Sequence, residues 1–123
     1  MKITQFKLLN AYDAASKLVN IKLPFKKSYA VYTLIKEMEE NRVFYAQEEK
    51  KLIEENRASI DESGRISFND AGSQIKFMQS REELNNLEID LKYEPITLTE
   101  SDLGGAGIAP LDMIQLEELI IFE

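Results

Sequence analysis

The longest run of helical hydrophobic spacing covers about residues 26–57. No Gly or Pro interrupts this stretch, and it is rich in Glu, Lys, Ala and Leu, which favour helices. Val31, Leu34, Ile35 and Met38 recur at helical spacing and predict a buried face in its first half. At about 1.5 Å per residue the helix is roughly 45 Å long, more than a compact domain of this size needs. We therefore expect its second half to project or to pack in an assembly.

The apolar stripe thins along the second half of this predicted helix. Tyr45, Leu52 and Ile53 continue it, but Asn41 and Glu48 occupy positions where a strict heptad needs apolar residues. Because a continuous coiled coil requires sustained apolar heptads, this stripe does not predict one.

Three shorter segments also indicate helices. Residues 4–20 have apolar residues at helical spacing, and the pattern ends before Pro24 because the residue that precedes a proline is pushed out of the helical region. Residues 71–85 follow Asn69 and Asp70, which are suitable N-cap residues. Pro110 suits the first position of a final helix. The candidates for the buried face of that final helix are Leu111, Ile114, Leu116 and Leu119.

Alternating polar and apolar residues predict a small sheet. Residues 87–93 alternate strictly, Pro95 ends the pattern, and residues 96–98 read as an edge strand. Residues 64–68 form another short strand, with residues 59–60 as its partner across a turn. The predicted fold is α+β and mainly helical, a single domain over residues 1–123 with about four helices, one of them long, and a small antiparallel sheet.

Composition removes most catalytic chemistry. The chain has no Cys and no His, so it lacks a disulfide framework, a thiolate ligand, and the usual general base near neutral pH. The first residues do not read as a signal peptide, and no apolar run approaches about 18 residues. We expect a cytoplasmic protein that does not associate with a membrane.

The remaining candidate chemistry is weak. The acids of the predicted loop and sheet region match no known metal-ligand spacing, and no sequence context singles out a nucleophilic Ser. The glycines of residues 104–107 are not followed by a Lys and are preceded by Glu100 and Asp102, which would repel phosphate, so we expect a flexible loop. The sequence predicts no enzyme activity, no cofactor and no metal site. The acids considered are Asp61, Glu62, Asp70, Glu88 and Asp90.

Charge is distributed unevenly along the chain. Residues 1–36 contain seven Lys and one acid, Asp13, for a net charge of +6, whereas the whole chain carries −7. No Lys or Arg follows Lys92, while seven acids do. Either the two ends complement each other within one fold or between subunits, or they form two partner surfaces of opposite sign.

Nucleic acid is not an expected partner. Lys22, Lys26 and Lys27 flank Phe25 and Tyr29, so basic and aromatic residues do interleave. The chain as a whole is acidic, however, which weakens the electrostatic attraction to phosphate. We expect a solvated helix start with the two rings tucked inward.

Protein contact is the function that remains. Phe44 and Tyr45 adjoin a charged stretch where a single domain has little left to cover them, so a partner helix is expected on the long helix. The alternative is that the helix of residues 71–85 folds back over them with Phe77 and Leu84. The predicted interface residues are Val31, Leu34, Met38, Phe44, Tyr45 and Leu52.

The order of these segments is itself a pattern. After the first helix come KLPFK at 22–26 and SY at 28–29, then the long Glu/Lys-rich helix with Asp61 and Gly64 beyond it, EIDL at 88–91, I-x-L at 96–98, Leu103, PL at 110–111 and LEELI at 116–120. This order resembles a family of small uncharacterised proteins encoded by phages and prophages of Gram-positive bacteria, over most of the chain. The resemblance implies a phage gene product from the structural or tail-to-lysis part of a genome, without an assigned active site.

The sequence thus predicts a non-enzymatic phage-type protein that acts through protein contacts, as an oligomer or an assembly accessory, in the host cytoplasm or on the virion. An acidic inhibitor or adaptor that binds a basic host or defence protein is the alternative.

Overall fold

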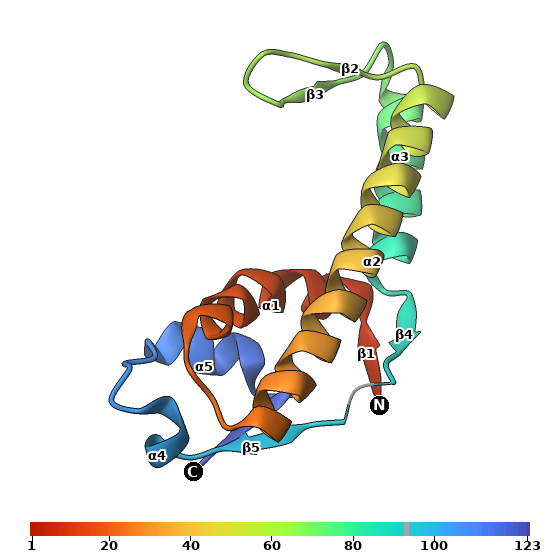
Figure 1. The fold of residues 1–123 in the computed structure, drawn as a ribbon. Coiled ribbons are helices and arrows are strands. Elements are labelled where there is room, and N and C mark those ends of the chain that lie inside the picture. The colour runs from red at the N-terminus through yellow and green to blue at the C-terminus, as the bar shows by residue number, and fades with distance from the viewer. Residues whose placement is uncertain (93) are drawn as a thin grey trace.

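The computed structural model describes residues 1–92 and 94–123, and helices dominate it, as predicted (Figure 1). The long helix, predicted over residues 26–57, spans Phe25–Glu55. The elements in chain order are β1 (Lys2–Thr4), α1 (Gln5–Lys17), the short 3-10 helix η1 (Leu18–Asn20), α2 (Phe25–Glu55), β2 (Ser59–Ile60), β3 (Ile66–Ser67), α3 (Ala71–Asn85), β4 (Glu88–Asp90), β5 (Ile96–Leu98), α4 (Glu100–Leu103), α5 (Pro110–Leu116) and β6 (Ile120–Phe122).

The hydrophobic core lies at one end of the molecule, which we call the base. There α1 packs against both the first half of α2 and α5 (Figure 1). The small side chains Ala11, Ala14 and Ala15 of α1 are fully buried, which lets the neighbouring helices approach closely. The largest fully buried apolar side chains of the core are Leu8, Leu34, Met38, Leu98, Leu116, Leu119 and Ile120.

The second half of α2 leaves the base, as its length predicted. Helix α3 runs back along it, and the β2–β3 hairpin lies at the far end (Figure 1). We call residues 44–85 the stalk. Arg81 Nε lies 3.3 Å from Glu49 Oε2, and the Phe77 and Phe68 ring centroids are 5.1 Å apart. These contacts join α3 to α2 and to the hairpin.

The strands that the structure describes in residues 1–92 and 94–123 form three separate pairs. Ile60 lies opposite Ile66 in the antiparallel β2–β3 hairpin, which confirms the predicted pairing across the turn. The other two pairs use the ends of the chain, where no strand was predicted: β1 pairs antiparallel with β4, and β6 pairs parallel with β5. Strands of three residues are too short to show the alternation that predicts a strand.

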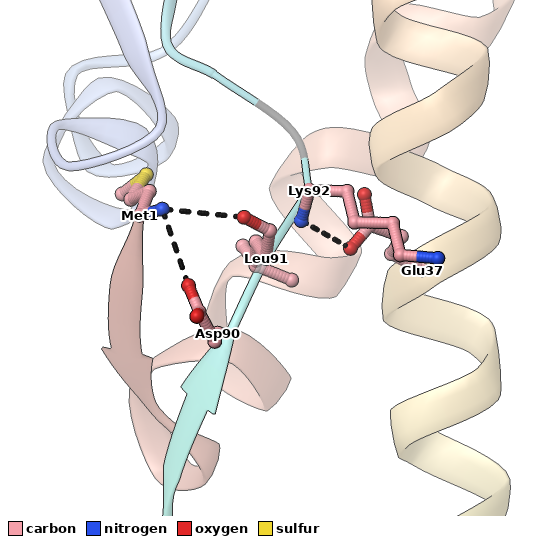
Figure 2. A network of polar contacts seen from close by, with 5 residues as sticks. All are labelled: Met1, Glu37, Asp90, Leu91 and Lys92. Carbon is pink, nitrogen blue, oxygen red and sulfur yellow. Dashed lines mark hydrogen bonds and ion pairs between the residues drawn. The ribbon is translucent and has the colours of Figure 1, made fainter.

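Polar contacts fix the segment that returns from the stalk to the base (Figure 2). The Met1 ammonium lies 3.5 Å from Asp90 Oδ1 and donates to the Leu91 carbonyl at 3.2 Å. On the other side, the Lys92 amide donates to Glu37 Oε2 at 2.9 Å. The end of β4 is therefore held between β1 and α2.

Side-chain caps mark where two helices begin. Asp70, a predicted cap candidate, accepts from the Ser73 amide at 2.7 Å and begins α3, and Thr99 and Asp102 form a capping box at the start of α4. A side chain at the N-cap satisfies an amide that has no partner within the helix, which is why these residues fix where each helix begins.

The predicted buried face of the final helix is partly wrong. Leu116 and Leu119 are buried, but Leu111 and Ile114 are exposed. Asp112 is buried instead and lies one helical turn before Leu116. The side of α5 that faces the core is therefore the side that carries Asp112 and Leu116. Within residues 1–92 and 94–123, no helix combines the length and apolar character that a membrane crossing requires.

Candidate interaction surface

Helix α2 carries two apolar faces, and only one of them is covered. The covered face belongs to the core of the base. Four large apolar side chains lie on the face that points away from the core: Phe25, Tyr29, Tyr32 and Val43 are 88%, 65%, 58% and 48% exposed. The first three are spaced by four and three residues, as positions on one side of a helix are. We call this side the outer face of α2.

An open hollow lies between the outer face and α1. It has a volume of about 760 Å³, and its walls are both apolar and charged. A second, smaller hollow of about 200 Å³ shares Tyr32 and Ile35 with it and reaches Leu23 and Val19. Apolar surface therefore continues from the start of α2 towards its middle. The larger hollow is lined by Tyr12, Tyr32, Ile35, Lys36, Glu39, Glu40, Arg42 and Val43.

Three polar residues of the larger hollow, Tyr12, Glu39 and Arg42, already contact one another. The Tyr12 hydroxyl donates to Glu39 Oε2 at 2.7 Å, and the Arg42 guanidinium lies 4.8 Å from the centre of the Tyr12 ring. The hydrogen bond to Glu39 raises the pKa of Tyr12, so this phenol stays protonated and neutral at physiological pH. The hydrogen bond between this neutral phenol and the carboxylate orients both side chains.

Three of the predicted interface residues are unavailable to a partner, which corrects the prediction. Val31, Leu34 and Met38 are only 3%, 0% and 1% exposed, because they form the face of α2 that packs into the core. Their regular helical spacing indicates an apolar face of α2. The structure shows that this face packs against the rest of the base and does not form a contact surface between proteins.

The other three predicted interface residues lie on the stalk. The Tyr45 hydroxyl donates to Asn85 Oδ1 at 2.8 Å, so α3 folds back over Tyr45, as the alternative interpretation had it. Leu52 is half-buried, and Phe44 remains exposed. Phe44 alone of these three is open to a partner.

Sequence reasoning missed the outer face. Phe25 and Tyr29 were expected to be tucked inward, and the structure shows the opposite. The signal was present in the spacing of Phe25, Tyr29 and Tyr32, which runs on the opposite side of the helix from Val31 and Leu34. Helix α2 thus carries two apolar stripes, and the base covers only one of them.

Lysines from the basic start of the chain form ion pairs with acids from its acidic end. Lys7 Nζ lies 2.8 Å from Glu118 Oε1, and Lys17 Nζ lies 3.0 Å from Asp112 Oδ2. Lys27 pairs with Asp102. These ion pairs confirm that the basic start and the acidic end complement each other inside one chain. Three of the seven acids after Lys92 are thereby engaged.

The ion pair between Lys27 and Asp102 leads to a prediction about pH. The hydrogen bond from Lys27 lowers the pKa of Asp102, and the Thr99 amide adds to the effect. A lowered pKa in the folded state stabilises the fold above the unfolded-state pKa of about 3.9, and this stabilisation is lost as the pH falls through the folded-state pKa. We expect Asp102→Asn to lower stability at pH 7 and to have progressively less effect as the pH falls through the lowered folded-state pKa.

Urea denaturation of both proteins between acid and neutral pH measures this difference. Asn can still accept from the Thr99 amide, so the variant chiefly tests the charge. Glu100→Gln, an exposed neighbour that pairs with no Lys or Arg among the described residues, is the matched control. An Asp102→Asn effect that persists unchanged at low pH would contradict the assignment.

Three of the five acids considered for a metal site, Asp61, Asp70 and Asp90, have local structural roles. Asp61 Oδ1 accepts from the Ser63 hydroxyl at 2.7 Å and from the Arg65 amide at 2.8 Å, so it organises the turn of the hairpin. Asp70 caps α3, and Asp90 faces the Met1 ammonium. Across residues 1–92 and 94–123, no three acids gather as a metal ion requires.

Comparison of the chain with protein-family models, with curated proteins and with solved structures finds no match.

Proposed function

We propose that this chain is a non-enzymatic phage-type protein that acts through protein–protein contacts, as part of an oligomer or as a structural accessory in the host cytoplasm or on the virion. The observation that carries the proposal is the outer face of α2, where Phe25, Tyr29, Tyr32 and Val43 remain uncovered. Large exposed apolar patches typically mark interaction sites.

The chemistry of the outer face suits a protein partner. Tyr and Phe are enriched in the centres of protein interfaces, and their rings bury much area for few rotatable bonds, so little conformational entropy is lost when they are ordered. A helix face of this kind is recognised by residues spaced three and four apart. Lys36, Glu39 and Glu40 lie among the apolar residues and give the face polar groups that select a partner.

The phage-type assignment comes from the order of elements in the sequence. The alternative, an acidic inhibitor of a basic protein, has less support, because Lys7, Lys17 and Lys27 engage three acids of the C-terminal region. The acidity is thus partly neutralised within the chain.

Site-specific photo-crosslinking tests the proposal. A photoreactive phenylalanine analogue replaces Tyr32 in cells that express the chain, and Gln79, an exposed residue of α3, serves as the control position. We expect protein adducts from position 32 and many fewer from position 79, and mass spectrometry identifies the partner. Equal adduct formation at the two positions, or none at either, would refute the proposal.

A further inference from the structure

The outer face of α2 has a pattern that extends beyond its aromatic residues. Alternating steps of four and three residues connect eight positions along one side of the helix, the spacing of a heptad seam. Seven of these side chains are exposed and Glu39 is half-buried. In the first half the positions are Phe25, Tyr29, Tyr32 and Lys36, and in the second half they are Glu39, Val43, Ala46 and Lys50.

We propose that this face binds the same face of a second copy, with the two α2 helices antiparallel about a two-fold axis that crosses the outer face between Lys36 and Glu39. This inference depends on the proposed function and names the partner. In an antiparallel pair each position of the first half meets one position of the second half. The facing positions are Phe25 and Lys50, Tyr29 and Ala46, Tyr32 and Val43, and Lys36 and Glu39.

Charge selects this arrangement. Lys36 of each copy faces Glu39 of the second copy, and the exposed Glu40 adds another carboxylate nearby. The two-fold axis repeats this pairing, so opposite charges meet twice at the centre. A parallel pair would instead place Lys36 against Lys36, Glu39 against Glu39 and Lys50 against Lys50. Like charges face to face disfavour that alternative.

The sizes of the side chains also match. The Tyr29 ring faces Ala46, whose small side chain leaves room for it, and Tyr32 faces Val43 at the wall of the larger hollow. Phe25, the most exposed ring of the stripe, faces Lys50, whose alkyl chain can cover the ring and whose ammonium can lie over its face.

The fold leaves space for the second helix. The core lies against Val31, Leu34 and Met38, on the opposite side of α2 from the outer face. In the stalk, α3 contacts Tyr45 and Glu49, which are also away from that face. Helix α2 runs along the outside of the base (Figure 1). A second copy can therefore approach along much of its length.

Introduced cysteines report the register directly, because the chain has no cysteine of its own. We expect Tyr32→Cys mixed with Val43→Cys to give a disulfide-linked dimer under mild oxidation, whereas Tyr32→Cys alone gives little. Tyr32→Cys mixed with Ile75→Cys, on the exposed side of α3, is the matched control and should not link. Efficient linkage of Tyr32→Cys to itself would indicate a parallel pair and overturn the proposal.

Sedimentation equilibrium measures the energetic contribution. We expect the unmodified chain to dimerise, and Tyr32→Ala, which removes a ring from both copies, to raise the dissociation constant roughly 30-fold or more. Lys36→Glu places a carboxylate against Glu39 and should weaken the dimer, whereas Lys76→Glu, an exposed change on α3 with the same net charge, should not. Equal effects of the two charge reversals would overturn the proposal.

The outcomes separate this inference from the proposed function. A strict monomer whose position 32 crosslinks to a different protein overturns self-association and leaves the proposed function supported. A monomer without position-specific adducts refutes both. A dimer in which Tyr32→Cys links to Val43→Cys, and hardly to itself, supports both.

Discussion

Replacement of Leu34 by alanine is expected to lower the free energy of unfolding by about 3 kcal/mol. The Leu34 side chain is fully buried and belongs to the same core as Leu8 and Leu116, so alanine would leave a cavity in the core of the base. A loss of this size is a large fraction of the roughly 5–15 kcal/mol that stabilises a typical domain. Urea denaturation followed by circular dichroism measures it.

Tyr32→Ala is the matched control for Leu34→Ala. It shortens a side chain of the same helix, two residues away and on the opposite face. At concentrations where the chain is monomeric, we expect it to change stability by less than about 0.5 kcal/mol, as exposed substitutions usually do. The pair of variants thereby separates the two faces of the helix. Similar stability losses for both would contradict the assignment of one buried and one free face.

The long elements could be predicted because their signals are local and repeated. Residues 71–85 were predicted as a helix with Asp70 among the cap candidates, and α3 has those bounds. Helix α2 begins and ends within two residues of its predicted limits. In both cases the spacing recurs over several turns, and a polar cap or a proline marks an end.

The short elements depend on partners that are distant in the sequence. Strands β1 and β6 have three residues each and pair with β4 and β5, so nothing local distinguishes them from loops. The rotation of α5 likewise follows from Asp112 packing beside Lys17, a contact between opposite ends of the chain. The charge distribution offered pairing of the two ends as one of two alternatives, but it could not name the pairs.

The interaction surface was misassigned for a similar reason. Periodicity shows that a helix has an apolar face, and it does not say whether the face meets the rest of its own chain or a partner. The stripe of Val31, Leu34 and Met38 gave the cleaner signal because a core selects aliphatic residues. The stripe that begins with Phe25 and Tyr29 is interrupted by charges, so its spacing does not stand out as a second apolar face, and the structure shows that these two rings are exposed.

The second large effect is expected in the stalk, from Phe77→Ala. Phe77 is 2% exposed and is the one buried residue of α3, a helix that the structure describes in full. Its ring contacts Phe68 of the hairpin segment, and the Arg81 guanidinium lies 5.9 Å from its centre. Truncation of a buried Phe costs about 3–5 kcal/mol. Because the stalk has few other buried apolar groups among its described residues, we expect the loss to be concentrated there.

Hydrogen exchange of backbone amides distinguishes local from global unfolding. We expect Phe77→Ala to accelerate exchange in α3 and in the second half of α2, while amides of α1 stay protected, because the core around Leu8 and Leu116 does not involve Phe77. Met78→Ala, the exposed neighbour of Phe77, is the control and should leave exchange unchanged. If α1 lost protection to the same extent as α3, stalk and base would form one cooperative unit. The expected asymmetry instead implies that the base keeps the first half of α2 folded, and with it the rings of Tyr29 and Tyr32 on the outer face, when the stalk opens.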